Sequence, residues 1–361
     1  MMEEKISPYQ LGMMIISYMA GSALVVNPAI AARHDAWLAF LLGWGGGMIL
    51  LFIIIKIVML HPTKSFVGIL IDCFGNFFGK LIAIIYGWYF VHLAAEVIRT
   101  YSNYTTTVTY PETPLLFFSI SYTLVVIYAL KIGIETIGRI SEIFVPFIVI
   151  VLIFTFTASL TSININNFQP ILSQGLDPIL KGGVATMILP FGEFFIFLMV
   201  LPNLNHQQSY KKTFLLAYLI AGCILFTVVC RNILVLGADM MARDIFPSHI
   251  VFRLIPVIDV APLLDMNLIM AGVVKTCICI YAASKLIAEV FGLSDYKIFI
   301  LPLGAFTVSL SMMVHGSVLE QATVAIEMWP IYSIPFQIII PIILLMISVI
   351  KKNLPANFKK Q

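Results

Sequence analysis

The chain has 361 residues, of which 60% are hydrophobic and only 11% are charged, and its mean hydropathy is +1.01. A soluble domain needs far more charge on its surface, so this composition excludes a soluble protein and indicates a multi-pass membrane protein. The formal net charge of +3 comes from basic residues that are spread along the chain and form no patch. It therefore gives no support for a nucleic-acid partner.

Apolar runs of about 20 residues recur along the chain, and each is long enough to cross a hydrocarbon core about 30 Å thick as a helix. We expect an all-α membrane protein that forms a single polytopic domain over residues 1–361, with ten transmembrane helices. The expected spans cover residues 10–32, 37–60, 81–109, 115–131, 141–160, 181–203, 212–236, 267–291, 296–314 and 330–349. Because ten is an even number, both termini should lie on the same side of the membrane.

Lysine and arginine residues in the loops predict which side that is. If the N-terminus is cytoplasmic, twelve basic loop residues fall inside and four fall outside, namely Arg33, Lys181, Arg243 and Arg253. Cytoplasmic loops of membrane proteins carry an excess of basic residues. We therefore expect both termini in the cytoplasm.

The first span should be interrupted rather than continuous. It contains Gly21-Ser22 near its middle and Asn27-Pro28 further on, and both pairs weaken a helix. Free backbone N–H groups around Gly21, Ser22 and Ala23 would lie beside the partly positive N-terminal end of the outer half-helix. A carboxylate would be stabilised there, although a sugar or another polar solute could use the same groups.

Two loops between the expected spans contain apolar segments. Residues 65–71, between spans 2 and 3, are apolar but too short to cross a membrane, so we expect a helix at the interface. The outer loop over residues 237–265 mixes short apolar pieces with charges and prolines. It is either a structured lid over an outer vestibule or a plain connector.

Span 3 contains two charged residues near the membrane midplane, Glu96 and Arg99. They are three residues apart, so they can form a self-contained ion pair on one helical face. Their depth matches that of Gly21 and of the carboxylate in span 6, however, so both are also candidates for a ligand site.

Span 6 is broken at Leu189-Pro190-Phe191-Gly192-Glu193. Proline removes a helix donor and glycine frees the backbone, so the break places Glu193 beside exposed carbonyl groups. A carboxylate at this depth costs about 2.5 kcal/mol or more and usually faces a cavity or the protein interior. Glu193, or the carbonyls around Leu189, could hold an ammonium group. The alternative is a simple kink with a protonated, hydrogen-bonded Glu193.

The second broken span comes five spans after the first. An odd number of spans in each half makes the second half enter the membrane from the opposite side, which predicts a 5+5 inverted repeat with interrupted helices 1 and 6. The first repeat should cover residues 8–160 and the second residues 178–350.

Lys275 in span 8 has no carboxylate three or four residues away, and its neighbour Thr276 adds a hydroxyl group. A lone ammonium in a membrane needs a partner from another helix or must lose its proton. Lys275 and Thr276 are therefore candidates for the same site.

The sequence gives no sign of a metal, a cofactor or a catalytic centre. Four of its five cysteines lie in apolar segments, and their spacing matches neither a disulfide framework nor a metal site. His92 and His315 are far in sequence from other metal-ligand types, so we interpret each as a packed or interfacial histidine. The motifs of intramembrane proteases and of serine hydrolases are also missing.

Four stretches together resemble one family, the spore germinant receptor B subunits of the amino acid–polyamine–organocation superfamily. They are Glu4-Lys5-Ile6-Ser7-Pro8-Tyr9-Gln10, Asp35-Ala36-Trp37, Gly133-Ile134-Glu135-Thr136-Ile137-Gly138-Arg139 with the following Glu142 and Pro146, and Pro190-Phe191-Gly192-Glu193. The resemblance extends over the whole chain and implies an amino-acid permease-like fold. On the superfamily pattern, spans 1, 3, 6 and 8 line the ligand site.

This resemblance implies a protein of the endospore inner membrane that recognises a nutrient such as an amino acid. It also implies two partners, an A subunit and a lipoprotein C subunit. A proton-coupled amino-acid permease is the rival function, because a sensor on this architecture would retain the same pocket. The sequence separates these two functions poorly.

Overall fold

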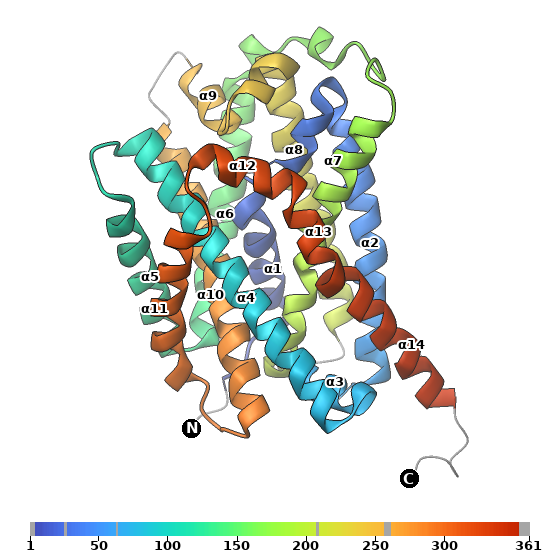
Figure 1. Ribbon diagram of the computed structural model, residues 1–361. Coiled ribbons are helices and arrows are strands. Elements are labelled where there is room, and N and C mark those ends of the chain that lie inside the picture. Colours follow the sequence, from blue (N-terminus) through green and yellow to red (C-terminus); the bar gives the residue numbers. More distant parts are fainter. Residues whose placement is uncertain (1–3, 25–26, 63, 207–208, 256–260, 354–361) are drawn as a thin grey trace.

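Most of the chain is helical in the computed structural model, which describes residues 4–24, 27–62, 64–206, 209–255 and 261–353 (Figure 1). Its α-helices are α1 (Pro8–Ala23), α2 (Ala36–Leu60), α3 (Phe66–Phe74), α4 (Asn76–Tyr104), α5 (Leu115–Ile132), α6 (Ile134–Ala158), α7 (Asp177–Ile188), α8 (Tyr210–Arg243), α9 (Pro247–Arg253), α10 (Ala261–Phe291), α11 (Lys297–Met313), α12 (Val318–Glu327), α13 (Trp329–Ile334) and α14 (Ile340–Asn353). Short 3-10 segments are η1 (Pro28–Asp35), η3 (Leu160–Ser162), η4 (Ile165–Phe168), η5 (Phe191–Met199) and η6 (Leu201–Asn203), and π segments are η2 (Thr105–Thr109) and η8 (Pro335–Ile339).

Eight helices in the described ranges are long and apolar enough to cross a membrane, and a ninth is counted if α11 and α12, bent by 99° at their break, form one span. The expected count of ten is therefore not confirmed. The first span accounts for the difference, because α1 has only 16 residues and measures about 24 Å, less than the hydrocarbon thickness. The start of α1 and the end of α14 lie at the same end of the molecule (Figure 1).

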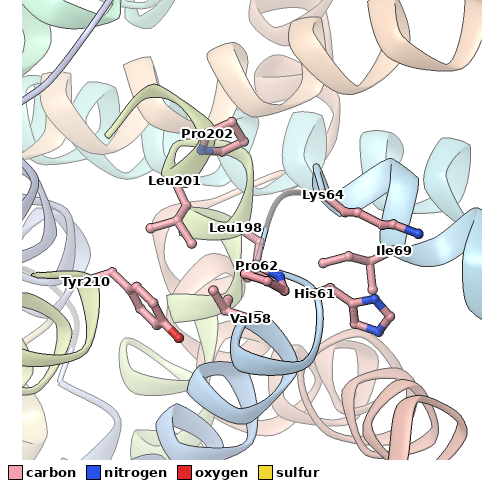
Figure 2. Close-up of a pocket in the computed structure, with 9 residues that line it drawn as sticks. All are labelled: Val58, His61, Pro62, Lys64, Ile69, Leu198, Leu201, Pro202 and Tyr210. Atoms are coloured by element: carbon pink, nitrogen blue, oxygen red, sulfur yellow. The ribbon is translucent and has the colours of Figure 1, made fainter. Parts of the chain in front are cut away.

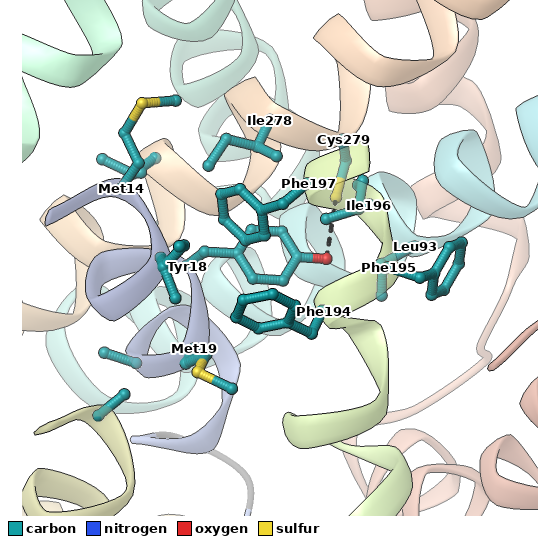
Figure 3. Packing of buried hydrophobic residues seen from close by; sticks show 14 of the residues in the cluster. Met14, Tyr18, Met19, Leu93, Phe194, Phe195, Ile196, Phe197, Ile278 and Cys279 are labelled. Carbon is teal, nitrogen blue, oxygen red and sulfur yellow. Dashed lines mark hydrogen bonds between the residues drawn. The ribbon is translucent and has the colours of Figure 1, made fainter. Parts of the chain in front are cut away.

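Helix α1 lies inside the bundle, packed against α6, α8 and α10 (Figure 1). Tyr18 shows how tightly it is held. Its ring meets Phe197 of η5 edge to face at 5.3 Å, and its hydroxyl lies 3.9 Å from the sulfur of Cys279 in α10 (Figure 3). Lipid tails are as apolar as the side chains, so the hydrophobic effect does not bring transmembrane helices together. Packing contacts and interhelical hydrogen bonds of this kind do so instead.

Of the two pairs expected to interrupt span 1, Gly21-Ser22 lies within α1, and Asn27-Pro28 lies at the interruption. Helix α1 continues through Gly21 to Ala23, and η1 begins at Pro28. Asn27 caps η1, because its side-chain oxygen accepts a hydrogen bond from the backbone N–H of Ala29 at 3.1 Å. Gly21 is therefore helical, and its N–H is not one of the exposed groups that the sequence suggested.

The predicted break in span 6 is confirmed. Helix α7 ends at Ile188, and η5 starts at Phe191 after the Leu189-Pro190 step. Proline has no N–H to donate and its ring obstructs the preceding turn, so an α-helix cannot continue through it. Every residue of η5 is buried.

The two loops behave differently. Residues 66–74 do form a helix, α3, whose N-cap Ser65 accepts a hydrogen bond from the N–H of Gly68 at 3.1 Å. In the outer loop, α8 continues past a kink at Gly237 to Arg243, and α9 follows. The sequence did not predict helix α12. Both α12 and α9 lie at the end of the molecule opposite the termini (Figure 1).

The terminal end of the bundle is closed by the segment that precedes α1. Ile6 pairs with Leu204 in a parallel bridge, and Glu4 accepts hydrogen bonds from Lys297 at 2.7 Å, Tyr296 at 2.8 Å and the N–H of Ile134 at 3.1 Å. Burial raises the pKa of Glu4, but these donors outweigh it and hold that pKa below its ordinary value. The carboxylate therefore ties the segment before α1 to two junctions between helices, α5–α6 and α10–α11.

Candidate functional site

The break in span 6 places a carboxylate at the centre of the protein. Glu193 lies in the first turn of η5 and is 0% exposed. A buried carboxylate that lacked a partner would be strongly unfavourable, so its surroundings must supply a counter-charge or hydrogen-bond donors.

Lys275 of α10 supplies the counter-charge. Its Nζ lies 2.5 Å from Oε2 of Glu193, and both side chains are fully buried. The ammonium also lies over the ring of Tyr18, 4.9 Å from the ring centroid, which adds a cation–π contact with α1. The partner that the sequence required of Lys275 is thus Glu193, and the pair joins the broken helix to α10 beside α1.

Gly21 brings α1 unusually close to α10. A Cβ atom at this position would lie 2.7 Å from the carbonyl oxygen of Ala271 and 2.8 Å from Cβ of Lys275, so only glycine fits. The carbonyl of Gly21 accepts a hydrogen bond from the hydroxyl of Tyr101. Gly21 is buried and this carbonyl already has its donor, so the expected contact of Gly21 with a ligand carboxylate stays a prediction.

Glu96 and Arg99 of span 3, which the sequence suggested could pair with each other, have other partners. Within the described ranges, no ion pair joins Glu96 to Arg99, and Arg99 instead donates to the carbonyl of Ser311 at 3.3 Å. Glu96 contacts Nε2 of His315 at 2.8 Å and Nε2 of His92 at 3.5 Å. The sequence interpreted these histidines as separate packed residues, but tertiary structure brings both to one carboxylate.

The remaining expected site residues make contacts with other parts of the protein. Phe191 packs against Phe40 with ring centroids 5.6 Å apart, and Gly192 is covered by Gln337 of η8. Thr276 faces Tyr122 of α5, with 3.0 Å between their hydroxyl oxygens. Ser22 and Ala23 belong to α1, and the side chain of Ser22 lies outside the described residues.

A small central cavity lies between Glu96 and Lys275. It has a volume of about 30 Å³, which is room for one or two water molecules. Its walls are Leu93, Glu96, Val97, Thr100, Leu189, Lys275, Gln321, Val324, Ala325 and Trp329. Of the expected site residues, Glu96, Leu189 and Lys275 line this cavity. Direct ligand contacts by the others stay predictions.

A larger outer cavity of about 290 Å³ lies next to the central one. It is enclosed by η1, α4, α12 and the α8–α9 connection, and Thr100 and Gln321 line both cavities. Gln321 donates to the hydroxyl of Thr100 at 2.9 Å and accepts from the side chain of Asn103 at 2.8 Å. These hydrogen bonds hold α12 against α4 and separate the two cavities.

A pocket of about 40 Å³ lies at the opposite end of the bundle (Figure 2). Its lining residues come from the end of α2, the start of α3, η5, η6 and the first turn of α8, and they are Val58, His61, Pro62, Lys64, Ile69, Leu198, Leu201, Pro202 and Tyr210. The larger opening is therefore on the α12 side.

Sequence reasoning missed Gln321 because it lies outside the predicted spans, and it missed the clustering of His92 and His315 because they are 223 positions apart in the printed sequence. A weak signal was present in both cases. His92 precedes Glu96 by four residues and so shares its helical face, and Ser317-Val318-Leu319-Glu320 is a capping box that marks a helix start.

Comparison with known sequences identifies relatives along nearly the whole chain. A family model described as "Spore germination protein" matches residues 5–318. Spore germination protein KB of Bacillus subtilis (strain 168) is 30% identical over 361 residues, which is 98% of this chain and 97% of that protein.

Solved transporter structures share the fold. A Na⁺-coupled sialic acid symporter in a substrate-bound, outward-open state matches with a TM-score of 0.68 and 11% identity, over 96% of this chain and 89% of that chain. MhsT in complex with L-phenylalanine matches with a TM-score of 0.66 and 13% identity, over 96% of this chain and 99% of that chain. At these identities the likeness establishes the fold alone, which is the expected permease-like one.

The close approach at Gly21 generates a first prediction. Gly21→Ala forces α1 and α10 apart and should lower the stability of the purified protein by about 1–3 kcal/mol, as overpacking does. Gly45→Ala is the matched control, because Gly45 lies in α2 with open space around its Cβ position, where alanine favours the helix. Thermal unfolding in detergent measures both. Equal melting temperatures for the two variants would contradict the assigned contact.

The central ion pair generates a second prediction. Lys275→Met leaves Glu193 buried without a counter-charge and should destabilise the protein by about 3–5 kcal/mol. Adding Glu193→Gln removes the uncompensated charge, so the double variant should regain much of that loss. Lys56→Met, at an exposed lysine of α2, controls for loss of a lysine. A single Lys275→Met variant as stable as the wild type would show that the pair contributes nothing.

Proposed function

This chain belongs to the spore germination protein family, and we propose that it is the membrane-embedded subunit of a spore germinant receptor that senses a small nutrient, most simply an amino acid. The observation that carries the proposal is the central cavity beside the break in span 6. Two charged groups of opposite sign, Glu96 and Lys275, stand in walls that are otherwise mostly apolar. An amino acid carries the complementary combination of two charges and an apolar side chain.

The ligand would bind by opening the closed cavity. The present volume of about 30 Å³ is too small for an amino acid, whereas the outer cavity of about 290 Å³ is large enough. Breaking the contacts of Gln321 with Thr100 and Asn103 would join the two. In this proposal the ammonium group meets the carboxylate of Glu96 or the carbonyls near Leu189, and the carboxylate meets Lys275.

A ligand that binds in this way can change the conformation of the protein. A carboxylate placed beside Lys275 would compete with Glu193 for the ammonium and so weaken the bond between η5 and α10. Because the same bond holds the broken helix in place, ligand binding and helix position become linked. The binding energy is then available to shift the protein between two states.

The proposed signal needs partner subunits, an A subunit and a lipoprotein C subunit. The connections between described helices hold only short 3-10 segments and α9, so none of them is large enough for a signalling domain. We place the protein in the inner membrane of the endospore with both termini on the core side. Co-purification from spore membranes tests the partners, and isolation of this chain alone would contradict them.

A proton-coupled amino-acid permease remains the second function. It is favoured by the transporter fold that the solved structures establish, since that fold moves solutes through alternating access. Both functions use the same pocket, and only transport separates them. Uptake of a labelled amino acid into proteoliposomes would support the permease, while binding without uptake would support the sensor.

Thermal unfolding of the purified protein across a panel of amino acids and sugars tests the proposed ligand. The true ligand should raise the stability by about 2.7 kcal/mol at a concentration one hundred times its Kd. Ala325→Trp fills the central cavity and should abolish the effect, whereas the same change at Ala305, which lies on α11 and lines neither cavity, should not. Stabilisation by sugars alone would contradict an amino-acid ligand.

A further inference from the structure

Glu96 lies between two histidines at the edge of the membrane-embedded core. Nε2 of His315 is 2.9 Å from one carboxylate oxygen and 2.8 Å from the other, and Nε2 of His92 is 3.5 Å from the first. The side chain of His315 is 3% exposed and that of Glu96 is 16% exposed. Histidine is the side chain best suited to exchange a proton near neutral pH, so a carboxylate flanked by two imidazoles is a candidate proton site.

Each imidazole has spare capacity for a proton. Nδ1 of His92 and Nδ1 of His315 are both buried and have no hydrogen-bond partner among the described residues. A neutral imidazole that donates through Nε2 leaves Nδ1 as an unprotonated acceptor. Protonation of Nδ1 turns the hydrogen bond to Glu96 into an ion pair. The group can therefore exist in two charge states without rearrangement of the backbone.

Other charged and titratable groups face this cluster from each neighbouring helix. Arg99 lies on the same helix, α4, and interacts electrostatically with Glu96 and with Glu320 of α12. Lys275 of α10 shares the central cavity, and Tyr332 of α13 is close enough to feel the charge of Glu96. With the carboxylate ionised, one added proton makes the two-histidine cluster neutral. A second proton would add a positive charge beside Arg99, which opposes it.

His315 also occupies a mechanically important position. It lies between α11 and α12, where the chain bends by 99°, and Gln321 one turn into α12 forms the contacts that separate the two cavities. His315 and Gln321 thus attach both ends of this short segment to α4. Weakening the first attachment should make it easier to lose the second.

We propose that Glu96, His92 and His315 form a proton-binding site whose occupancy controls the docking of α12 over the central cavity. With the proton bound, the ion pair between His315 and Glu96 holds α12 in place. After the proton leaves at higher pH, a weaker hydrogen bond from a neutral imidazole remains, and α12 undocks more readily. This control operates whether the pocket senses a ligand or transports it.

Tryptophan fluorescence tests proton binding directly. Trp329 lies with its ring centroid 5.4 Å from that of His92, and a protonated imidazole at such a distance quenches indole emission. Acidifying the purified full-length protein from about pH 8 to about pH 5 should lower the emission. Subtracting the signal of Trp329→Phe isolates this tryptophan. The change should disappear in a variant with both His92→Gln and His315→Gln.

The matched control is His61→Gln, which removes a histidine at the opposite end of the molecule, where it contacts Ser348 at 2.9 Å. It should leave the Trp329 signal unchanged. Emission from Trp329 that does not vary with pH, or that varies equally in the double histidine variant, would overturn the proton site.

Cysteine labelling tests the link to α12 without any ligand. Val97 lines the central cavity and is 2% exposed, so Val97→Cys should react with a membrane-impermeant thiol reagent only when α12 undocks. Every cysteine reacts faster at about pH 8 than at about pH 6, because the thiolate is the reactive form. Undocking of α12 should add to this rise, so the ratio of the two rates should be larger than in the double variant Val97→Cys with His315→Gln, which keeps a hydrogen bond but cannot titrate at position 315. The parent protein without Val97→Cys gives the background from the native cysteines.

The labelling results decide whether the protonation state of His315 controls the docking of α12. An equal ratio of the rates at the two pH values with and without His315→Gln would show that His315 does not control access. The absence of labelling at either pH would show that α12 does not undock. Neither readout involves a nutrient, so failure of the nutrient-binding proposal would leave this test unaffected.

Discussion

The ion pair between Lys275 and Glu193 is the interaction on which the rest of this structure depends. Two opposite charges buried completely inside a membrane protein must remain in contact, because separating them leaves an uncompensated charge in a medium that cannot solvate it. Glu193 can reach Lys275 only because the chain breaks at Pro190 and continues as a 3-10 segment. The break in the helix therefore lets Glu193 reach Lys275, and the buried lysine needs this carboxylate as its counter-charge.

The same requirement explains the close packing around the pair. Gly21 has no side chain, so α1 can approach the backbone of α10 directly beside Lys275. Tyr101 then donates to the carbonyl of Gly21, and Tyr18 covers the ammonium with its ring. Such contacts exclude lipid and water from the pair, which strengthens its electrostatic attraction. A solute that enters must replace one of these partners rather than fill an empty space.

The two ends of the molecule differ in how they are closed. At the terminal end, Glu4 is held by three donors from two helix junctions, and Ile6 pairs with Leu204. At the other end, α12 rests on α4 through a few polar contacts, chiefly those of Gln321, above which the large outer cavity lies. Helix α12 also packs against α7, α13 and η1, and the cluster of Glu96, His92 and His315 lies at the bend between α11 and α12. The route to the central cavity from the α12 side and the group proposed to control that route thus lie in the same place.

The sequence by itself determined the membrane class, most of the spans, the break at Pro190 and the need of Lys275 for a partner, because these follow from composition, local backbone chemistry and the energetics of a buried charge. In span 1 it correctly named Asn27-Pro28 but wrongly included Gly21, which looks like a helix breaker until its packing against α10 is seen. Only tertiary structure decided that Lys275 meets Glu193 and that His315 meets Glu96. Such pairings join residues far apart in the chain, and local periodicity contains no information about which distant helix face will lie opposite.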